Sequence, residues 1–225
     1  MAINLSAFEQ VKAALAPFQA KLVAVSKIKP VADIQALYDA GQRIFGENYV
    51  QELADKQPRL PADIAWHFIG HLQSNKVKYI APFVDTIHAV DSIKLLQEIN
   101  KQAGKHQRVI HCLLQVYIAA EETKFGMDEQ ELLQLLDAWK AAENTFPHIR
   151  IAGLMGMATN TDNETQIRKE FHHLKALHTS IKETYFREHD YFKELSVGMS
   201  GDYLLALQEG STMVRIGSLL FGARL

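Results

Sequence analysis

A single cysteine, Cys112, is found among the 225 residues of the chain. One cysteine cannot make a disulfide within the chain, so the fold does not depend on an oxidising compartment. Cys112 lies in the apolar run 109–117, where a free cysteine usually behaves as a small buried hydrophobe. We therefore expect a cytoplasmic protein whose cysteine fills part of the core.

Long apolar segments are missing as well. No run approaches the roughly 20 apolar residues that a membrane-spanning helix needs. The first 15 residues have the pattern of an amphipathic helix. They lack the basic start, apolar stretch and small-residue cleavage site of a signal peptide. The sequence predicts neither a membrane segment nor a secretory leader.

An excess of positive charge is also lacking. Lysine and arginine together number 24, aspartate and glutamate 26, and the net charge is −2. A nucleic-acid binder needs a basic surface to displace counterions from phosphates, so we exclude RNA or DNA as the main partner. Because there are no fixed-period repeats, low-complexity tracts or Gly/Ser linkers, residues 1–225 are predicted to form one domain.

Short segments rich in valine and isoleucine alternate with longer helical patterns along the chain. Each short segment is almost continuously apolar, which is typical of parallel strands covered on both faces. Eight such strands alternating with helices predict an α/β protein, a single (β/α)8 TIM barrel. The predicted strands are Leu22–Val25, Arg43–Phe45, Ala65–Ile69, Thr86–Val90, Val109–Val116, Ile149–Met155, Glu194–Val197 and Met213–Ile216.

The clearest helical patterns cover Pro30–Ala40, Asp91–Gln102, Asp128–Glu143 and Glu164–Phe186. The alternative architecture is a doubly wound open sheet, which normally carries G-x-G-x-x-G after its first strand. Here the first strand continues into Ser26-Lys27-Ile28-Lys29-Pro30, without a glycine. We therefore favour the barrel.

Lys27 directly follows the first predicted strand. Barrel enzymes keep their chemistry at the carboxyl ends of the strands. A lysine at such a buried mouth loses solvation, which lowers its pKa and makes its amine nucleophilic, as Schiff-base chemistry requires. The alternative is a solvated loop lysine, which is our interpretation of Lys29.

Asn48 follows the second predicted strand, and His67 lies within the third. Asn48 either orients a ring substituent, with its one acceptor and two donors, or caps the helix that begins at Tyr49. His67 is either a functional residue of the barrel interior or a core histidine with satisfied hydrogen bonds. Position alone leaves both pairs of alternatives open.

Glycine and serine follow the last two predicted strands, at Ser200 and at Gly217–Ser218. In TIM barrels a phosphate is often held by the loops after strands seven and eight and by the N-terminus of a short extra helix. The run 198–202 is not a nucleophile elbow, because Asp202 stands where G-x-S-x-G has its last glycine. These residues predict a ligand that carries a phosphate.

Arg215 lies two residues before Gly217, so both face the same side of a strand. A buried arginine needs an acceptor, which is either a structural carboxylate or an aromatic ring nitrogen. His172, His173 and His178 lie on the last long helix without the H-E-x-x-H pattern. We interpret them as a solvated helix face and predict no metal site.

Five segments, spread in order over nearly the whole chain, resemble the pyridoxal phosphate homeostasis protein family. They are A-V-S-K-I-K-P at 24–30, F-G-E-N-Y-V-Q-E at 45–52, W-H-F-I-G-H-L-Q-S-N-K at 66–76, L-S-V-G-M-S at 195–200 and G-S-T-M-V-R-I-G at 210–217. The resemblance implies the barrel of the N-terminal domain of alanine racemase. It also implies that pyridoxal 5′-phosphate (PLP) is held as an internal aldimine on Lys27.

The resemblance further implies roles around the cofactor. It places Asn48 beside the cofactor, Arg215 opposite the pyridine nitrogen and His67 in the pocket wall. One position departs from the family: Tyr117, larger and less polar, stands where an asparagine usually follows the Gln-Val pair. Lys76 and Lys124 are further candidates for the rim of the pocket. The implied phosphate contacts are Ser200, Gly217 and Ser218.

An arginine opposite the pyridine nitrogen can only donate, which would leave PLP a weak electron sink. Racemases of this barrel type take a second acid/base from a C-terminal domain across a dimer interface, and this chain ends at Leu225, directly after the barrel. We expect a monomer that buffers PLP or delivers it to apo PLP enzymes, with little or no turnover. Two alternatives remain: a PLP-dependent amino-acid racemase or decarboxylase, and an enzyme that forms a Schiff base between Lys27 and a sugar phosphate.

Overall fold

Eight parallel strands close into a barrel in the computed structural model, which describes residues 3–121 and 125–222. Each strand pairs with its neighbours in chain order, and β8 pairs with β1 to close the ring. The predicted (β/α)8 barrel is confirmed. The strands are β1 (Lys21–Val25), β2 (Ile44–Glu47), β3 (Ala65–Phe68), β4 (Thr86–Val90), β5 (Ile110–Tyr117), β6 (Ile149–Met157), β7 (Glu194–Ser196) and β8 (Met213–Ile216).

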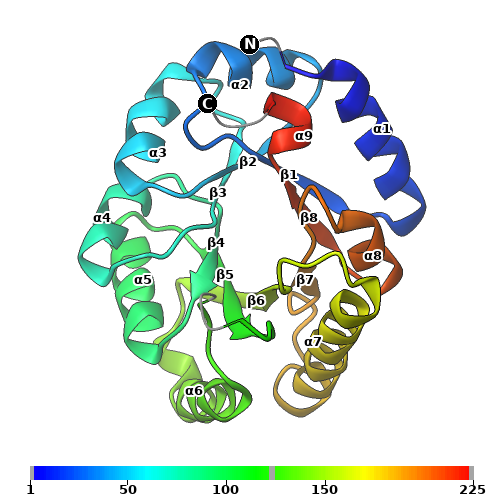
Figure 1. Cartoon of the computed structure of the whole chain (residues 1–225). Helices are drawn as coiled ribbons and strands as arrows, with labels where there is room; N and C mark the ends of the chain where they lie inside the picture. The colour runs from blue at the N-terminus through cyan, green and yellow to red at the C-terminus, as the bar shows by residue number, and fades with distance from the viewer. Residues whose placement is uncertain (1–2, 122–124, 223–225) are drawn as a thin grey trace.

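Helices surround the strands on the outside of the barrel (Figure 1). The four clearest predicted helices are present as α2 (Val31–Asp39), α5 (Ile93–Lys105), α6 (Glu129–Ala141) and α7 (Glu164–Tyr185). The remaining elements are α1 (Leu5–Leu15), α3 (Val50–Lys56), α4 (Val77–Ile80), α8 (Tyr203–Gln208) and α9 (Ser218–Phe221), with the 3-10 turns η1 (Ala16–Phe18), η2 (Gln57–Arg59), η3 (Ser74–Lys76) and η4 (Glu143–Thr145).

The residue at which each strand ends is set by its pairing with the neighbouring strand. The apolar pattern of the sequence alone does not show where this pairing stops. β2 was predicted to end at Phe45, but its pairing with β3 continues until Glu47 lies opposite Phe68. β6 likewise continues past Met155 because Met157 pairs with Tyr117 of β5. The backbone hydrogen bonds of a strand must be satisfied by its partner, so a polar residue such as Glu47 still belongs to the sheet.

The main hydrophobic cluster of the fold is made of buried apolar side chains and includes the single cysteine. Cys112 is fully buried in β5, as predicted, and burial raises the pKa of its thiol. A buried thiol with a raised pKa is an inert core residue. Within residues 3–121 and 125–222, no helix combines the length and the apolar character needed to cross a membrane.

Closure of the barrel brings the two ends of the sequence together. β1 and β8 are neighbours, with Ala24 opposite Ile216, so the turn after β1 lies beside the turn after β8. A Cβ atom added to Gly217 would lie 3.3 Å from both Cβ and the carbonyl oxygen of Val25. Figure 1 shows α9, in red, next to the end of β1. Residues separated by almost the whole chain therefore share one edge of the barrel.

Candidate functional site

A cavity of about 300 Å³ lies where the carboxyl ends of β1, β2 and β8 meet the loop after β7. Six of the seven predicted site residues line it: Lys27, Asn48, Ser200, Arg215, Gly217 and Ser218. The other lining residues are Val25, Lys29, Ile69, Met157, Met199, Gly201 and Gly222. The structure thus gathers residues from both ends of the sequence around one space.

The wall of this cavity is positively charged. Lys27, Lys29 and Arg215 line it, and its described lining residues include no carboxylate. Ser200 and Ser218 add hydroxyl groups that can donate hydrogen bonds. A concave surface that gathers cations attracts anions, so the cavity suits a ligand that carries a phosphate.

The turn that carries Lys27 is fixed on the side of Ser26. The hydroxyl of Ser26 donates to Oε1 of Glu47 (2.6 Å). Nζ of Lys56 donates to the same carboxylate oxygen and to the carbonyl oxygen of Ser26 (2.8 Å each). Burial raises the pKa of Glu47, while the charge of Lys56 opposes that shift. A buried ion pair supported by further hydrogen bonds holds the backbone just before Lys27 in one place.

The turn is also fixed on the side of Ile28. Ile28 has a φ of +63°, a left-handed conformation that is costly for a β-branched residue. The carboxylate of Glu52 accepts hydrogen bonds from the backbone N–H of Ile28 and from Nζ of Lys56 (2.6 Å each). This support was not predicted from the sequence, although Glu52 and Lys56 have the i,i+4 spacing of a helical ion pair. Lys27 is therefore held between two anchored residues.

Asn48 lines the cavity and does not cap a helix. The N-cap of α3 is Tyr49, and no side chain caps this helix. Oδ1 of Asn48 is buried, and no hydrogen-bond partner for it is found in the described part of the chain. A buried acceptor without a donor is costly, so this atom marks a place where a ligand can bind.

Gly70 supports Asn48 from behind. A Cβ atom on Gly70 would lie 2.3 Å from the carbonyl oxygen of Asn48 and 2.9 Å from its Cα. We expect Gly70→Ala to displace the backbone of Asn48, to lower the free energy of unfolding by about 1–3 kcal/mol, and to weaken ligand binding in the cavity. Chemical denaturation measures the first effect and ligand titration the second.

The control for this substitution is Gly201→Ala, because a Cβ atom on Gly201 would meet no atom within 4 Å. Its free energy of unfolding should stay near that of the parent chain. If Gly70→Ala unfolded at the same denaturant concentration as Gly201→Ala, the close approach to Asn48 would be wrong.

Arg215 is buried at the floor of the cavity without a carboxylate hydrogen-bonded to it in the described residues. Its Nη1 donates to the carbonyl oxygen and to Oγ of Ser196 (2.7 Å each), and its Nη2 donates to the carbonyl oxygen of Gly156 (3.0 Å). Burial lowers the pKa of the guanidinium to about 10, and the charge of Asp202 opposes this shift. Arg215 is therefore charged at neutral pH, and part of its five-donor group is left for an acceptor in the cavity.

Sequence comparison places the chain in a family. The family model of the alanine racemase N-terminal domain matches residues 4–225. The pyridoxal phosphate homeostasis protein of Vibrio alginolyticus is 39% identical over 223 residues, which cover 96% of this chain and 92% of that protein. The protein of the same name from Escherichia coli K12 is 37% identical, over 92% of this chain and 87% of that protein. The chain belongs to the pyridoxal phosphate homeostasis protein family.

Solved structures agree with this assignment. PipY of Synechococcus elongatus, solved with PLP bound, has a TM-score of 0.83 and 33% identity, covering 96% of this chain and 99% of PipY. Alanine racemase from Streptomyces coelicolor has a TM-score of 0.75 at 17% identity, covering 99% of this chain and 60% of the racemase. The second likeness is one of fold alone. The homeostasis-protein family and the racemases share this barrel.

Lys29 lines the cavity, which its predicted role did not include. It was interpreted as a solvated loop lysine, but it is half-buried and its Nζ donates to the carbonyl oxygens of Phe221 (2.8 Å) and Gly222 (3.4 Å). Lys29 thus ties the turn after β1 to the end of α9. Of the two candidates for the rim, Lys76 borders a neighbouring cavity that shares Asn48, and Lys124 lies outside the described residues.

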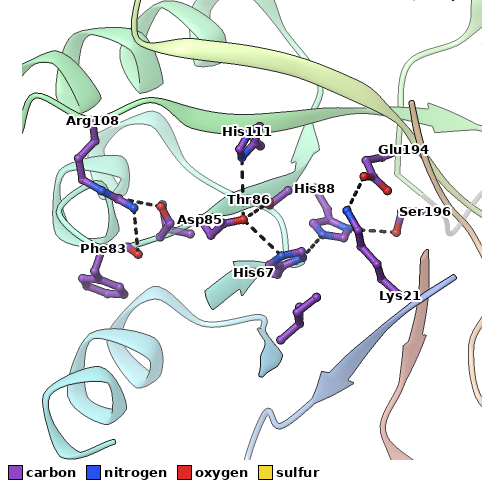
Figure 2. Close-up of polar contacts among 12 residues, drawn as sticks. Lys21, His67, Phe83, Asp85, Thr86, His88, Arg108, His111, Glu194 and Ser196 are labelled. Carbon is purple, nitrogen blue, oxygen red and sulfur yellow. Dashed lines mark hydrogen bonds and ion pairs between the residues drawn. The ribbon is translucent and has the colours of Figure 1, made fainter. Parts of the chain in front are cut away.

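His67 does not lie where the resemblance implied. It borders a second cavity, at the amino ends of the strands, together with Lys21, Asp85 and Glu194. Side chains inside a TIM barrel form layers, and His67 belongs to a layer on the far side of Arg215 from the candidate site. Its Nδ1 makes a 2.8 Å hydrogen bond with Nε2 of His88 (Figure 2). The structure supports the alternative, a buried core histidine.

Tyr117, which departs from the usual residue of the family, is not among the lining residues of the cavity. It ends β5, and its hydroxyl donates to the carbonyl oxygen of Glu121 (2.8 Å). The side chain of Tyr117 therefore stabilises the loop after β5.

The histidines of α7 form a solvated face only in part. His172 and His173 are exposed, as predicted, and lie near Glu209 and Glu129 respectively. His178 is buried and stacks on Phe192 with the ring centroids 4.8 Å apart, so its predicted exposure is wrong. No cluster of metal-ligating side chains is found within residues 3–121 and 125–222.

Proposed function

We propose that this chain binds PLP covalently through the amine of Lys27 and takes part in PLP homeostasis in the cytoplasm, as a buffer or carrier with little or no turnover. The proposal rests on the cavity whose described lining brings together a lysine amine, a guanidinium and two serine hydroxyls. The names of the curated relatives and the PLP bound to PipY support it.

The residues present fit this cofactor. PLP carries a phosphate, and the cavity is lined by cations and hydroxyl groups. PLP also carries polar ring substituents, and the buried Oδ1 of Asn48 is an acceptor without a partner in the described structure. Gly217 has no side chain, and a Cβ atom there would lie 3.3 Å from Val25, so the turn after β8 packs closely against β1 at the edge of the cavity. The unpartnered acceptor of Asn48 is otherwise a cost to the fold.

The positions of the residues suggest their roles. The amine of Lys27 forms the carbon–nitrogen double bond with the cofactor aldehyde and releases water. Ser200, Gly217 and Ser218, from the turns after β7 and β8, hold the phosphate with hydroxyl and backbone N–H groups. Asn48 orients a ring substituent. His67 is left out of the proposed site.

Arg215 bears on whether the site turns over a substrate. When bound, PLP supplies an electron sink, and a carboxylate beside its ring nitrogen would strengthen that sink. The guanidinium can only donate, so it holds a neutral, accepting ring nitrogen and keeps the sink weak. A reversible covalent bond without efficient substrate chemistry suits storage and delivery of a reactive aldehyde. We therefore propose a PLP-binding protein with little or no turnover, and we propose separately that it acts as a monomer.

The test begins with purified chain freed of ligand and mixed with PLP. We expect the absorbance of a protein-bound Schiff base, and borohydride reduction followed by peptide mapping should place the adduct on Lys27. Failure of the protein to take up PLP would overturn the proposal. Trapping of a sugar phosphate on Lys27 in place of PLP would favour the Schiff-base enzyme on sugar phosphates.

A second measurement separates a carrier from a racemase or decarboxylase. The holo protein is incubated with each amino acid in deuterated water, and exchange at Cα and release of carbon dioxide are followed. We expect neither above the rate of free PLP. Delivery is then measured as activation of an apo PLP enzyme, with and without a small-molecule trap for free aldehyde. Activation that survives the trap indicates direct transfer.

A further inference from the structure

A line of buried polar side chains crosses the barrel from Arg215 to the opposite mouth. Oγ of Ser196, which accepts from Arg215, lies 3.1 Å from Nδ1 of His88. Nε2 of His88 lies 2.8 Å from Nδ1 of His67. Nε2 of His67 then faces Oδ2 of Asp85 at 3.6 Å. Figure 2 shows Asp85, His67, His88 and Ser196 in this order.

The chemistry of Arg215 fixes, from one end of the line, which group donates and which accepts in each hydrogen bond. A guanidinium has donors only, so Oγ of Ser196 must accept from it. The single hydroxyl hydrogen of Ser196 is then left to donate to Nδ1 of His88. A neutral histidine that accepts at Nδ1 carries its hydrogen on Nε2, so His88 donates to Nδ1 of His67.

At the other end of the line, Asp85 requires the same order of donors and acceptors. His67 accepts at Nδ1, so its hydrogen is on Nε2 and points at the carboxylate of Asp85. At 3.6 Å this last link is an electrostatic contact, longer than a hydrogen bond. The opposite arrangement would set a nitrogen lone pair against a carboxylate and leave the hydroxyl of Ser196 without an acceptor. Only one arrangement of hydrogens satisfies every group.

The surroundings favour the neutral form of both histidines, although Asp85 opposes this for His67. Burial lowers the pKa of His67 and of His88, and for His88 the charge of Arg215 lowers it further. The contact with His67 and the hydrogen bond from Thr86 hold the pKa of Asp85 below its usual range. The line thus has a permanent cation at one end and a carboxylate at the other, with neutral donors and acceptors between them.

We infer that Ser196, His88 and His67 form a one-way hydrogen-bond relay that positions the guanidinium of Arg215 for the acceptor in the cofactor cavity. His88 and His67 are positioning residues that lie outside the cofactor site and act through Ser196. The inference rests on the proposed function only for the identity of the acceptor, the pyridine nitrogen of PLP. The relay itself belongs to the chain without ligand.

The first test therefore uses the ligand-free chain. Two-bond ¹⁵N–¹H correlation spectra of the histidine rings report which nitrogen carries the hydrogen. We expect His67 and His88 to be neutral at neutral pH, each with its hydrogen on Nε2. A hydrogen on Nδ1 of either ring, or on both nitrogens, would overturn the relay whether or not the chain binds PLP.

The second test measures positioning with variants of His88. His88→Leu removes both ring nitrogens, whereas His88→Gln keeps one acceptor and one donor. His178→Leu is the matched control, a buried histidine of α7 outside the relay. We expect His88→Leu to bind PLP about tenfold more weakly, the size of one buried hydrogen bond, and His88→Gln and His178→Leu to stay near the parent affinity.

PLP labelled with ¹⁵N in its ring separates positioning from stability. In the parent chain, in His88→Gln and in His178→Leu, the pyridine nitrogen should show the same shift, that of a nitrogen accepting a hydrogen bond. In His88→Leu the shift should move towards that of a free pyridine nitrogen. If His88→Leu matched His178→Leu in both affinity and shift, His88 would be a core residue and no more. If the parent chain bound no PLP, the proposed function would be wrong. The histidine tautomers of the ligand-free chain would still show whether the relay exists.

Discussion

Lys27→Ala is expected to abolish the covalent PLP adduct completely while leaving the barrel folded. Lys27 is half-buried in a turn, and the hydrogen bonds that hold this turn are made by Ser26, Ile28, Glu52 and Lys56. The free energy of unfolding should fall by about 1 kcal/mol or less, the size of one partly exposed polar interaction. Borohydride reduction followed by intact-mass measurement checks the adduct, and thermal unfolding checks the fold.

Lys29→Ala is the matched control, since Lys29 lines the same cavity two residues further along. It loses its bonds to the end of α9 but leaves the amine of Lys27, so the adduct should still form. Noncovalent PLP should still bind to Lys27→Ala through the phosphate contacts and Arg215. An adduct that persisted in Lys27→Ala and disappeared in Lys29→Ala would move the reactive amine to Lys29.

The gathering of Lys27, Ser200, Gly217 and Ser218 could be predicted because it follows from topology. In a closed parallel barrel all carboxyl ends of the strands meet at one mouth, and β8 must lie next to β1. Residues that directly follow strands therefore share a site, whatever their separation in the sequence. The strand pattern needed only to be correct to within a residue or two for this inference to hold.

The interior of the barrel could not be predicted in the same way. The position of His67 within a strand does not say which layer its side chain joins, because the stagger between strands decides that. His88 escaped attention because its partners lie on other strands, with Ser196 108 residues away. Lys29 was misjudged because its acceptors belong to the end of α9, whose return to β1 is a property of the closed fold.

Acid is expected to destabilise the chain steeply, because His67, His88 and His178 are buried and neutral. Burial lowers the pKa of each from the usual 6.5, for His178 to about 4. Below pH 6.5 the unfolded chain therefore binds protons at these three residues while the folded chain does not. Each can remove at most about 1.4 kcal/mol of stability per pH unit below pH 6.5, until the pH falls through the lowered pKa of that residue, which is about 4 for His178.

The raised pKa of Glu47 acts in the opposite direction, but it involves only one proton. Urea unfolding at pH 7, 6, 5 and 4.5 measures the slope of stability against pH. His178→Phe keeps an aromatic ring against Phe192 and removes one of the three protons, so it should reduce the slope by about 1.4 kcal/mol per pH unit. A free energy of unfolding that stayed constant between pH 7 and 5 would mean that the folded and unfolded chains bind protons equally in this range, so burial would not hold these histidines neutral in acid.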